Sequence, residues 1–245
     1  MLEIAVDSVE SASNAVAGGA HRLELCSALS LGGLTPTSGL LRVCKRRTWQ
    51  SGLPIFCMIR SRPGNFVYNN LEFELMLEDM KVLKMEGADG FVFGILTEHG
   101  KVDVARCEQL VQLCHPLPCT FHRAFDVAHQ WRESLGLLGA IGFQRILTSG
   151  QADNVDLGMQ DLVQMVDEGK RLGVSVMPGG GVNCSNLAKL AEVCKAEEYH
   201  TSASVPQSLR SNSMTFGSSE LSYEHKVTSI EIVEDLVRIL NNVQF

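Results

Sequence analysis

The sequence lacks the short motifs that would assign it directly to a functional class. Its eight cysteines include no C-x-x-C pair, and the chain has neither a G-x-x-x-x-G-K-[ST] loop nor an H-E-x-x-H motif. These absences exclude a paired-cysteine metal motif, a P-loop for nucleotides and a zinc-protease helix. Any catalytic or binding site must therefore be assembled from residues that are far apart in the sequence.

Membrane-spanning and targeting segments are absent as well. No apolar run reaches the length of a membrane span, and no charged segment followed by an apolar core resembles a signal peptide. The first strand is expected to begin within three residues of Met1. We therefore expect a cytoplasmic protein with reduced cysteines, several of which lie in apolar runs as small buried side chains.

Basic residues are outnumbered by acidic ones, 21 to 28, which gives a net charge of -7. This balance argues against a general affinity for nucleic acid or for an anionic membrane surface, although it leaves room for a local basic pocket. The remaining candidates for a partner are small molecules, metal ions and other protein chains.

Short apolar strands and amphipathic helices alternate along the chain. The expected strands cover residues 3–7, 22–26, 54–60, 90–96, 120–126, 145–148, 174–177 and 199–203. Eight strand–helix units in a chain of this length predict an α/β protein with a (β/α)8 (TIM) barrel, as one domain over residues 1–245. A doubly wound open sheet is the alternative, which the regular count of eight disfavours. Residues 205–226 are Ser-rich and are expected to form an irregular loop before the last helix.

Polar residues gather at the predicted C-terminal ends of these strands, where barrel enzymes place their active sites. We take Glu24, Arg60, His122 and Asp126 as candidate catalytic residues: Glu24, His122 or Asp126 would be the general acid or base, and Arg60 would help to bind an anion. His122 and Asp126 fall on one face of the predicted strand 120–126. The structural alternative is that His122 is a core histidine, that Asp126 caps the next helix, and that Glu24 and Arg60 form an internal ion pair.

An anion site is predicted after the seventh strand. Gly179, Gly180 and Gly181 would expose backbone N–H groups beside a helix expected to start near Asn183. Ser202, on the eighth strand, and Arg62, after the third, would complete it. Together with a general acid or base, such a site predicts a lyase or isomerase that moves a proton on a small phosphate- or carboxylate-bearing metabolite.

Cys26 ends the second predicted strand and is the candidate metal ligand, because a thiolate selects Cu(I) or Zn(II). The neighbouring position on the first strand is Ala5, which offers no donor, and Met58 on the third strand is a potential substitute. From the residues alone, Cys26 is interpreted as a buried thiol rather than as a ligand.

Several segments resemble the CutC family of copper homeostasis proteins. The matching segments are Val6-Asp7-Ser8, Arg22 to Cys26, Thr120 to Asp126, Leu147 to Gly150, Met177 to Gly181 and His200 to Ala203. The resemblance implies a (β/α)8 barrel and a cytoplasmic homo-oligomer linked to copper handling, with Cu(I) bound by cysteine. It assigns the metal to Cys26, while Ala5 stands where copper-binding animal members carry a second cysteine.

Overall fold

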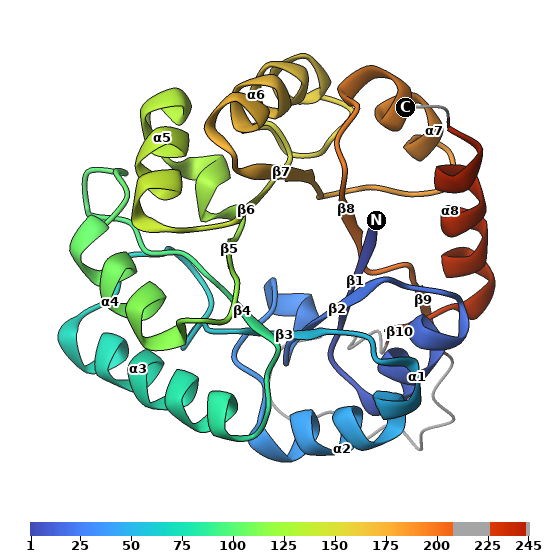
Figure 1. The fold of residues 1–245 in the computed structure, drawn as a ribbon, viewed down its shortest axis with the longest axis horizontal. Helices are drawn as coiled ribbons and strands as arrows, with labels where there is room; N and C mark the ends of the chain where they lie inside the picture. Colours follow the sequence, from blue (N-terminus) through green and yellow to red (C-terminus); the bar gives the residue numbers. More distant parts are fainter. Residues whose placement is uncertain (208–225, 244–245) are drawn as a thin grey trace, which may run out of the picture.

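The computed structural model describes residues 1–207 and 226–243, and eight parallel strands form its centre. The strands are β1 (Leu2–Val6), β2 (Arg22–Leu25), β3 (Ile55–Met58), β4 (Gly90–Phe93), β5 (Cys119–Phe121), β6 (Arg145–Thr148), β7 (Ser175–Pro178) and β8 (Tyr199–Thr201). Their order in the sheet is β7-β6-β5-β4-β3-β2-β1-β8. A parallel bridge between Gly179, which directly follows β7, and His200 of β8 brings the two ends of the sheet together. The predicted (β/α)8 barrel is confirmed (Figure 1).

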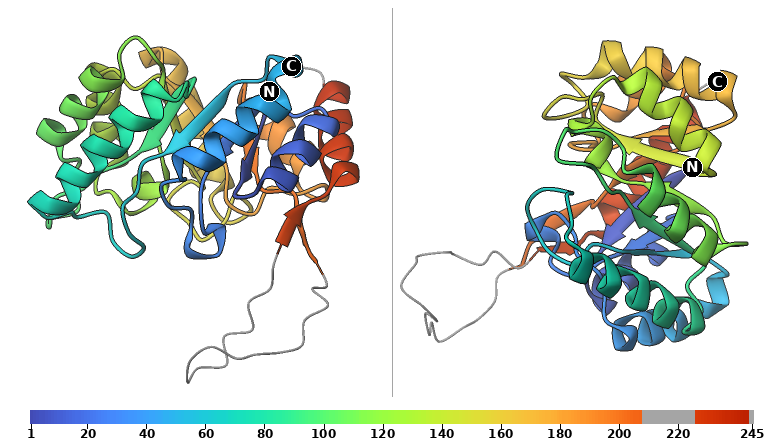
Figure 2. Two further views of the ribbon diagram at one scale, coloured as in Figure 1. Left: turned by 90° about the horizontal axis from the view of Figure 1, so that it is seen from below. Right: turned by 90° about the vertical axis from the view of Figure 1, so that its left-hand side faces the viewer.

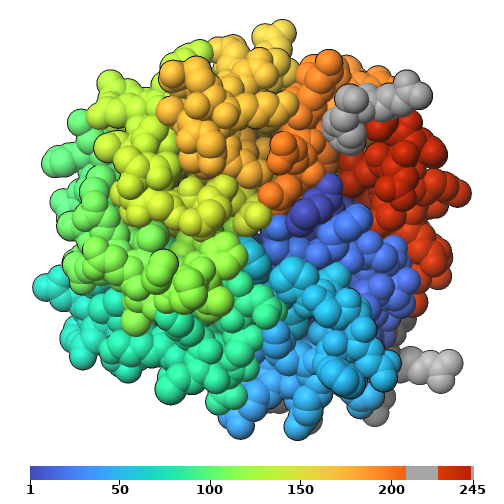
Figure 3. Space-filling view, in the orientation of Figure 1, coloured from blue at the N-terminus to red at the C-terminus, as the bar shows by residue number. Residues whose placement is uncertain are grey.

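Helices cover the outside of this ring. They are α1 (Val9–Ala17), α2 (Ser38–Thr48), α3 (Asn70–Met85), α4 (Val104–Cys114), α5 (Trp131–Ile141), α6 (Met159–Leu172), α7 (Leu187–Cys194) and α8 (Ile230–Asn242), with three short 3-10 helices η1 (Leu29–Leu31), η2 (Trp49–Ser51) and η3 (Arg123–Val127). The outward side chains of the strands pack against these helices in one large apolar core. Figure 3 shows that side chains fill the centre of the ring on the face turned toward the viewer.

Side-chain caps fix where the helices begin. Thr37 accepts a hydrogen bond from the Leu40 N–H at the start of α2, and Asn69 forms a capping box with Glu72 at the start of α3. Both caps satisfy backbone donors that have no partner within the helix. A second threonine, Thr35, and a second asparagine, Asn70, lie within two residues of these caps, and only the local backbone decides which of them is used.

The predicted strand 120–126 is shorter in the structure. β5 ends at Phe121, and His122 caps η3 by accepting a hydrogen bond from the Ala124 N–H at 3.2 Å. The single-face relation between His122 and Asp126 is therefore wrong, since a 3-10 turn rather than a strand joins them. Asp126 does not cap the following helix, because α5 begins after Gln130.

The two ends of the Ser-rich segment are ordered as a small antiparallel ribbon. β9 (Ser204–Pro206) pairs with β10 (Lys226–Thr228) and projects from one end of the barrel (Figure 2). Residues 205, 206 and 226 are thus strand residues, and the rest of the predicted irregular loop lies outside the described residues. The assignment of 1–245 to one domain stays a prediction for the same reason. Among the described helices, none has the length and apolar character needed to cross a membrane.

Candidate functional site

Inside the barrel, near the N-terminal ends of the strands, acidic and basic side chains form a series of ion pairs. Arg145 Nε lies 2.6 Å from Glu198 Oε2, Glu198 also pairs with Arg22, and Arg22 pairs with Glu3. The two guanidinium groups lie over the ring of Phe56, at 5.0 Å for Arg22 and 5.5 Å for Arg145. Because positive and negative groups alternate, each buried charge has an opposite neighbour.

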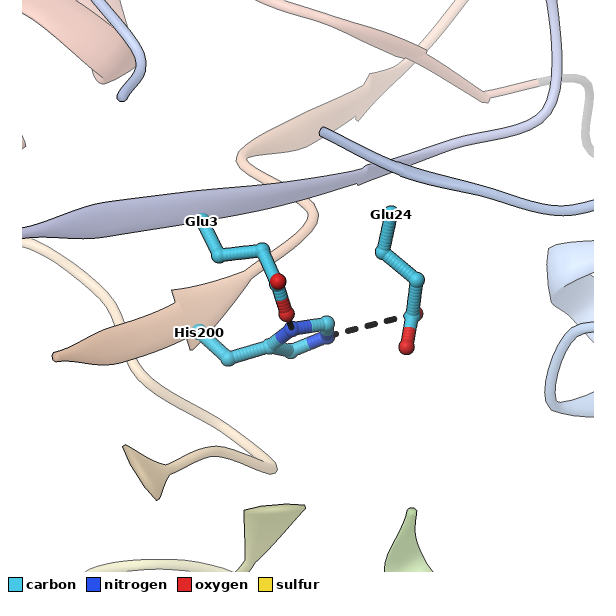
Figure 4. A group of neighbouring side chains, drawn as sticks. All are labelled: Glu3, Glu24 and His200. Carbon is cyan, nitrogen blue, oxygen red and sulfur yellow. Dashed lines mark hydrogen bonds and ion pairs between the residues drawn. The ribbon is translucent and has the colours of Figure 1, made fainter. Parts of the chain in front are cut away.

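Glu3 extends this series of ion pairs toward the middle of the barrel. Its carboxylate accepts a hydrogen bond from His200 Nδ1 at 2.7 Å, and His200 Nε2 lies 3.7 Å from Glu24 Oε2. The imidazole thus lies between two carboxylates from β1 and β2 (Figure 4). One ligand atom from each of the three residues lies within 4.8 Å of the others, which is close enough to bind a metal ion.

The pKa values of Glu3, Glu24 and His200 are shifted differently by their surroundings. Burial opposes ionisation of Glu3, but Arg22 and the hydrogen bond from His200 keep its pKa at about 2. Burial and the nearby charge of Glu3 raise the pKa of Glu24 to about 7, although His200 opposes this shift. The pKa of His200 is raised, because Glu24 and Glu3 outweigh burial. Glu24 is therefore the carboxyl group that can exchange a proton near neutral pH.

Cys26 lies above Glu24 at the end of β2. Its thiol donates to Glu24 Oε2 at 3.6 Å, and burial together with this carboxylate raises its pKa well above the ordinary value. It packs with Phe56, Met58 and Val92 in an apolar cluster inside the barrel, separate from the main core. The resulting environment favours a protonated thiol in the absence of a bound cation.

Because Gly33 has no side chain, its backbone can lie close to this thiol. A Cβ atom at Gly33 would lie 3.0 Å from Cys26 Sγ and 3.6 Å from the terminal methyl of Met58. The two sulfur-containing side chains therefore meet at one point under a glycine. The φ angle of Gly33 is +81°, which a residue with a side chain rarely adopts.

Arg60 and His122 are both buried at the C-terminal end of the barrel. Arg60 donates to the carbonyl groups of Leu31, Gly33 and Gly64, which ties the loops after β2 and β3 together. It forms no ion pair with Glu24 in the described part of the chain. The ring of His122 lies 4.8 Å from that of Phe66, and burial and the charge of Arg60 lower the pKa of His122 to about 3.

Three of the four candidate catalytic residues have a buried polar atom without a hydrogen-bond partner among the described residues. These atoms are Glu24 Oε1, Arg60 Nε and His122 Nε2. Such atoms are costly to leave unsatisfied, and a bound ligand or water can satisfy them. Asp126 is the candidate whose carboxylate is fully hydrogen-bonded by its neighbours.

Asp126 has a different environment. Its carboxylate accepts hydrogen bonds from the Thr148 hydroxyl, from Ser149 N–H at 3.0 Å and from Gln151 N–H at 3.2 Å, and it pairs with Arg123 at 2.7 Å. These bonds join the segments after β5 and β6. The carboxylate thus holds two loops in place.

The glycine segment after β7 has Arg123 beside it. A Cβ atom at Gly180 would lie 3.0 Å from the guanidinium carbon of Arg123. Arg62 instead pairs with Glu72 near the start of α3, where it lines an outer surface hollow. The Ser202 hydroxyl lies 3.0 Å from that of Ser204. The helix after the glycine segment, α7, begins at Leu187 and not near Asn183.

Sequence reasoning assigned no role to Glu3, Arg22 or His200. These three residues, together with Glu24, make the continuous charge network of the barrel. Alternation in β1 and β2 puts Glu3 and Arg22 on the inner face, and register pairs Glu3 with both Arg22 and His200. The register of β1 against β2 and β8 could not be predicted from the sequence alone.

A second thiol environment lies outside the sheet, at the other end of the strands. Cys114 ends α4 and Cys119 begins β5. The hydrogen bond from the Cys119 thiol lowers the pKa of Cys114, burial opposes this effect, and Lys84 supports it. The other seven cysteines, all within the described residues, have raised pKa values.

These features define a class of protein, a (β/α)8 barrel whose interior carries a Glu–His–Glu cluster with a thiol above it. The model of the CutC family matches residues 1–205. The copper homeostasis protein cutC homolog of mouse is 43% identical over 252 residues, which cover 99% of this chain and 90% of the mouse protein. The chain belongs to the CutC family, as the resemblance predicted.

Solved structures agree with this assignment. The crystal structure of CutC from Streptococcus agalactiae matches with a TM-score of 0.78 and 30% identity, covering 82% of this chain and 98% of that one. Deoxyribose phosphate aldolase from Aeropyrum pernix matches with a TM-score of 0.60 and 16% identity, covering 82% and 85% of the two chains. The aldolase shares the fold alone.

Proposed function

We propose that this chain acts in copper homeostasis by binding Cu(I) inside the barrel, through the thiolate of Cys26. The convergence of Cys26 and Met58 under Gly33 carries the proposal. A thiolate and a thioether are both soft donors, and such donors select Cu(I) over the hard divalent ions that carboxylates prefer. Met58 would thus provide the second donor that Ala5 cannot.

Glu24 would serve as the proton acceptor for this step. Cu(I) binding forms a copper–sulfur bond and breaks the S–H bond of Cys26. The released proton can pass to Glu24 Oε2, 3.6 Å away, whose pKa of about 7 leaves it partly ionised at neutral pH. His200 and Glu3 hold this carboxylate in a polar setting, so that the proton stays inside the barrel.

An anaerobic titration of the reduced chain with Cu(I), in competition with a Cu(I) chelator, tests the proposal. Cys26→Ser is expected to remove one equivalent of bound copper, and Met58→Leu to weaken that equivalent by about tenfold or more. Cys44→Ser is the matched control, since Cys44 is a buried thiol on α2 in the outer core. An unchanged stoichiometry in Cys26→Ser would contradict interior copper binding.

A second candidate function is an enzyme that moves a proton on a small anionic metabolite. The unpartnered atoms of Glu24, Arg60 and His122 favour it, because a substrate would satisfy them. Glu24 would be the general acid or base, and the N–H groups of Gly180 and Gly181 would hold the anion beside Arg123.

Inorganic phosphate is a direct probe of this anion site. The melting temperature is expected to rise with phosphate, and the rise should be lost in Arg123→Met and retained in Arg62→Met. The same screen is then repeated with small phosphorylated and carboxylated metabolites. A response that depends on Arg62 instead would support the composition predicted from the sequence. No response to phosphate in the parent chain would exclude the anion site.

We also propose that the chain forms a homo-oligomer through α3. Leu71, Leu75, Val82 and Met85 are 76%, 49%, 40% and 81% exposed and lie at helical spacing along one stripe. A second copy of this chain would bury the stripe. Leu75→Glu is expected to lower the mass measured by sedimentation equilibrium, and an unchanged mass would direct the search to another surface. A cytoplasmic location stays a prediction.

A further inference from the structure

We infer that the loop between α4 and β5 holds a second Cu(I) site, formed by the thiols of Cys114 and Cys119. Cys119 begins β5, so that the pair lies at the N-terminal end of the strands, whereas Cys26 follows the C-terminal end of β2. The two sites share no residue. The inference therefore stands or falls independently of copper binding at Cys26.

The four residues between the cysteines fold the chain back on itself. Leu117 N–H donates to the Cys114 carbonyl at 3.0 Å, and the Cys114 thiol donates to the Leu117 carbonyl at 3.1 Å. This turn places the Cys119 thiol beside that of Cys114, where it lowers the pKa of Cys114. A two-coordinate Cu(I) site needs sulfur atoms roughly 4–4.6 Å apart, about twice the length of a metal–thiolate bond, and two cysteines joined by one tight turn can provide this spacing.

Lys84 supplies a positive charge at this position. Its ammonium group donates to the carbonyls of Leu113 and His115, the neighbours of Cys114 on both sides, at 2.8 and 2.7 Å. A bis-thiolate complex of Cu(I) carries one negative charge, which the ammonium group would offset. The interior thiol, by contrast, faces the carboxylate of Glu24.

The chemistry of binding is balanced without a redox partner. Two Cu–S bonds form, two S–H bonds break, and both protons leave to solvent, while copper and sulfur keep their oxidation states. Both thiols are buried, but the intervening His115 and Pro116 are exposed, so that the pair lies close beneath the surface. All eight cysteines lie in the described part of the chain, and no other two of them are joined by a hydrogen bond there.

The test is an anaerobic Cu(I) titration of the full-length chain against a chelator, followed by thiolate-to-copper charge-transfer absorption. The parent chain is expected to bind two equivalents, and Cys114→Ala and Cys119→Ala one each. Cys107→Ala is the matched control, because this buried thiol lies on the same helix with its Sγ near the Ile95 carbonyl, and it should keep both equivalents. Near-ultraviolet circular dichroism verifies that each variant is folded.

A variant that keeps both thiols tests the site even if the cysteine variants fail to fold. In the Cys26→Ser background, Lys84→Met should weaken the remaining Cu(I) about tenfold, while Lys81→Met, which removes an exposed lysine of the same helix, should not. Two equivalents retained in Cys114→Ala, or none bound in Cys26→Ser, would overturn the inference. If Cys26→Ser keeps two equivalents and Cys114→Ala loses one, the dithiol site stands and interior binding at Cys26 fails.

Discussion

The two thiol environments lie at opposite ends of one barrel and differ in the charge that faces them. Cys26 is enclosed inside the sheet and donates to Glu24, so that a thiolate there meets a negative group. Cys114 lies outside the sheet, hydrogen-bonded to a second thiol and near Lys84. A thiolate is therefore disfavoured at the first position and favoured at the second.

This difference has a structural origin. The interior is a closed polar network in which each charge depends on its neighbours, from Arg145 through Glu198 and Arg22 to Glu3. The α4–β5 loop depends only on local turns and one half-buried lysine, Lys84. Cu(I) at Cys26 would change the protonation of a network, whereas Cu(I) at Cys114 would displace only two thiol protons. The following variants test this contrast.

The largest effect is expected for Arg22→Met. It leaves the carboxylates of Glu3 and Glu198 buried without their shared partner, so the free energy of unfolding should fall by about 3–5 kcal/mol. Arg171→Met is the matched control, since its partner Glu168 lies on the surface of α6, and it should leave the free energy of unfolding almost unchanged. Urea unfolding at pH 7 measures both variants, and equal losses would show that the interior network does not hold the barrel together.

The alternation of the strands made part of this network predictable. Alternation within the second strand puts Glu24 and Cys26 on one inner face. The fold itself was predictable because short apolar strands alternate with helices eight times. The alternation did not give the register between β1 and β8, which brings Glu3 to His200 across 197 residues of sequence. The contacts of Arg62 and Arg123 depend on loop conformations that no periodic pattern encodes, so that the position of Arg123 beside Gly180 was not predictable from the sequence.

The next effect concerns pH. The pKa of Glu24 is raised from about 4.5 to about 7 on folding, so the folded chain binds an extra proton between these values, and stability is lost as the pH rises through 7. The raised pKa of His200 acts in the same direction. The lowered pKa of His122 acts in the opposite direction, so the contribution of Glu24 is read as the difference between the parent chain and Glu24→Gln, which should fall by about 1–3 kcal/mol between pH 5 and pH 8.

Glu24→Gln removes one titrating group and also the charge that raises the pKa of His200. The parent chain should therefore lose stability relative to Glu24→Gln as the pH rises from 5 to 8, measured by urea unfolding at several pH values. Glu72→Gln, at an exposed ion pair with Arg62, is the control and should follow the parent chain near neutral pH. A difference between the parent chain and Glu24→Gln that stays constant from pH 5 to pH 8 would show that Glu24 is ionised throughout.

The smallest effect is expected at the α4–β5 loop. Lys84→Met removes the ammonium group beside Cys114, so the pKa of this thiol should rise, while the free energy of unfolding should change by only about 1 kcal/mol because the lysine bonds two carbonyl groups near the surface. The pKa is measured from ultraviolet thiolate absorbance, as the difference between each chain and its Cys114→Ala counterpart. Lys81→Met should leave it unchanged. Equal thiol pKa values with and without Lys84 would mean that the contact with Cys119 alone distinguishes this thiol from Cys26, and the contrast between the two ends of the barrel would then depend on sulfur pairing and not on charge.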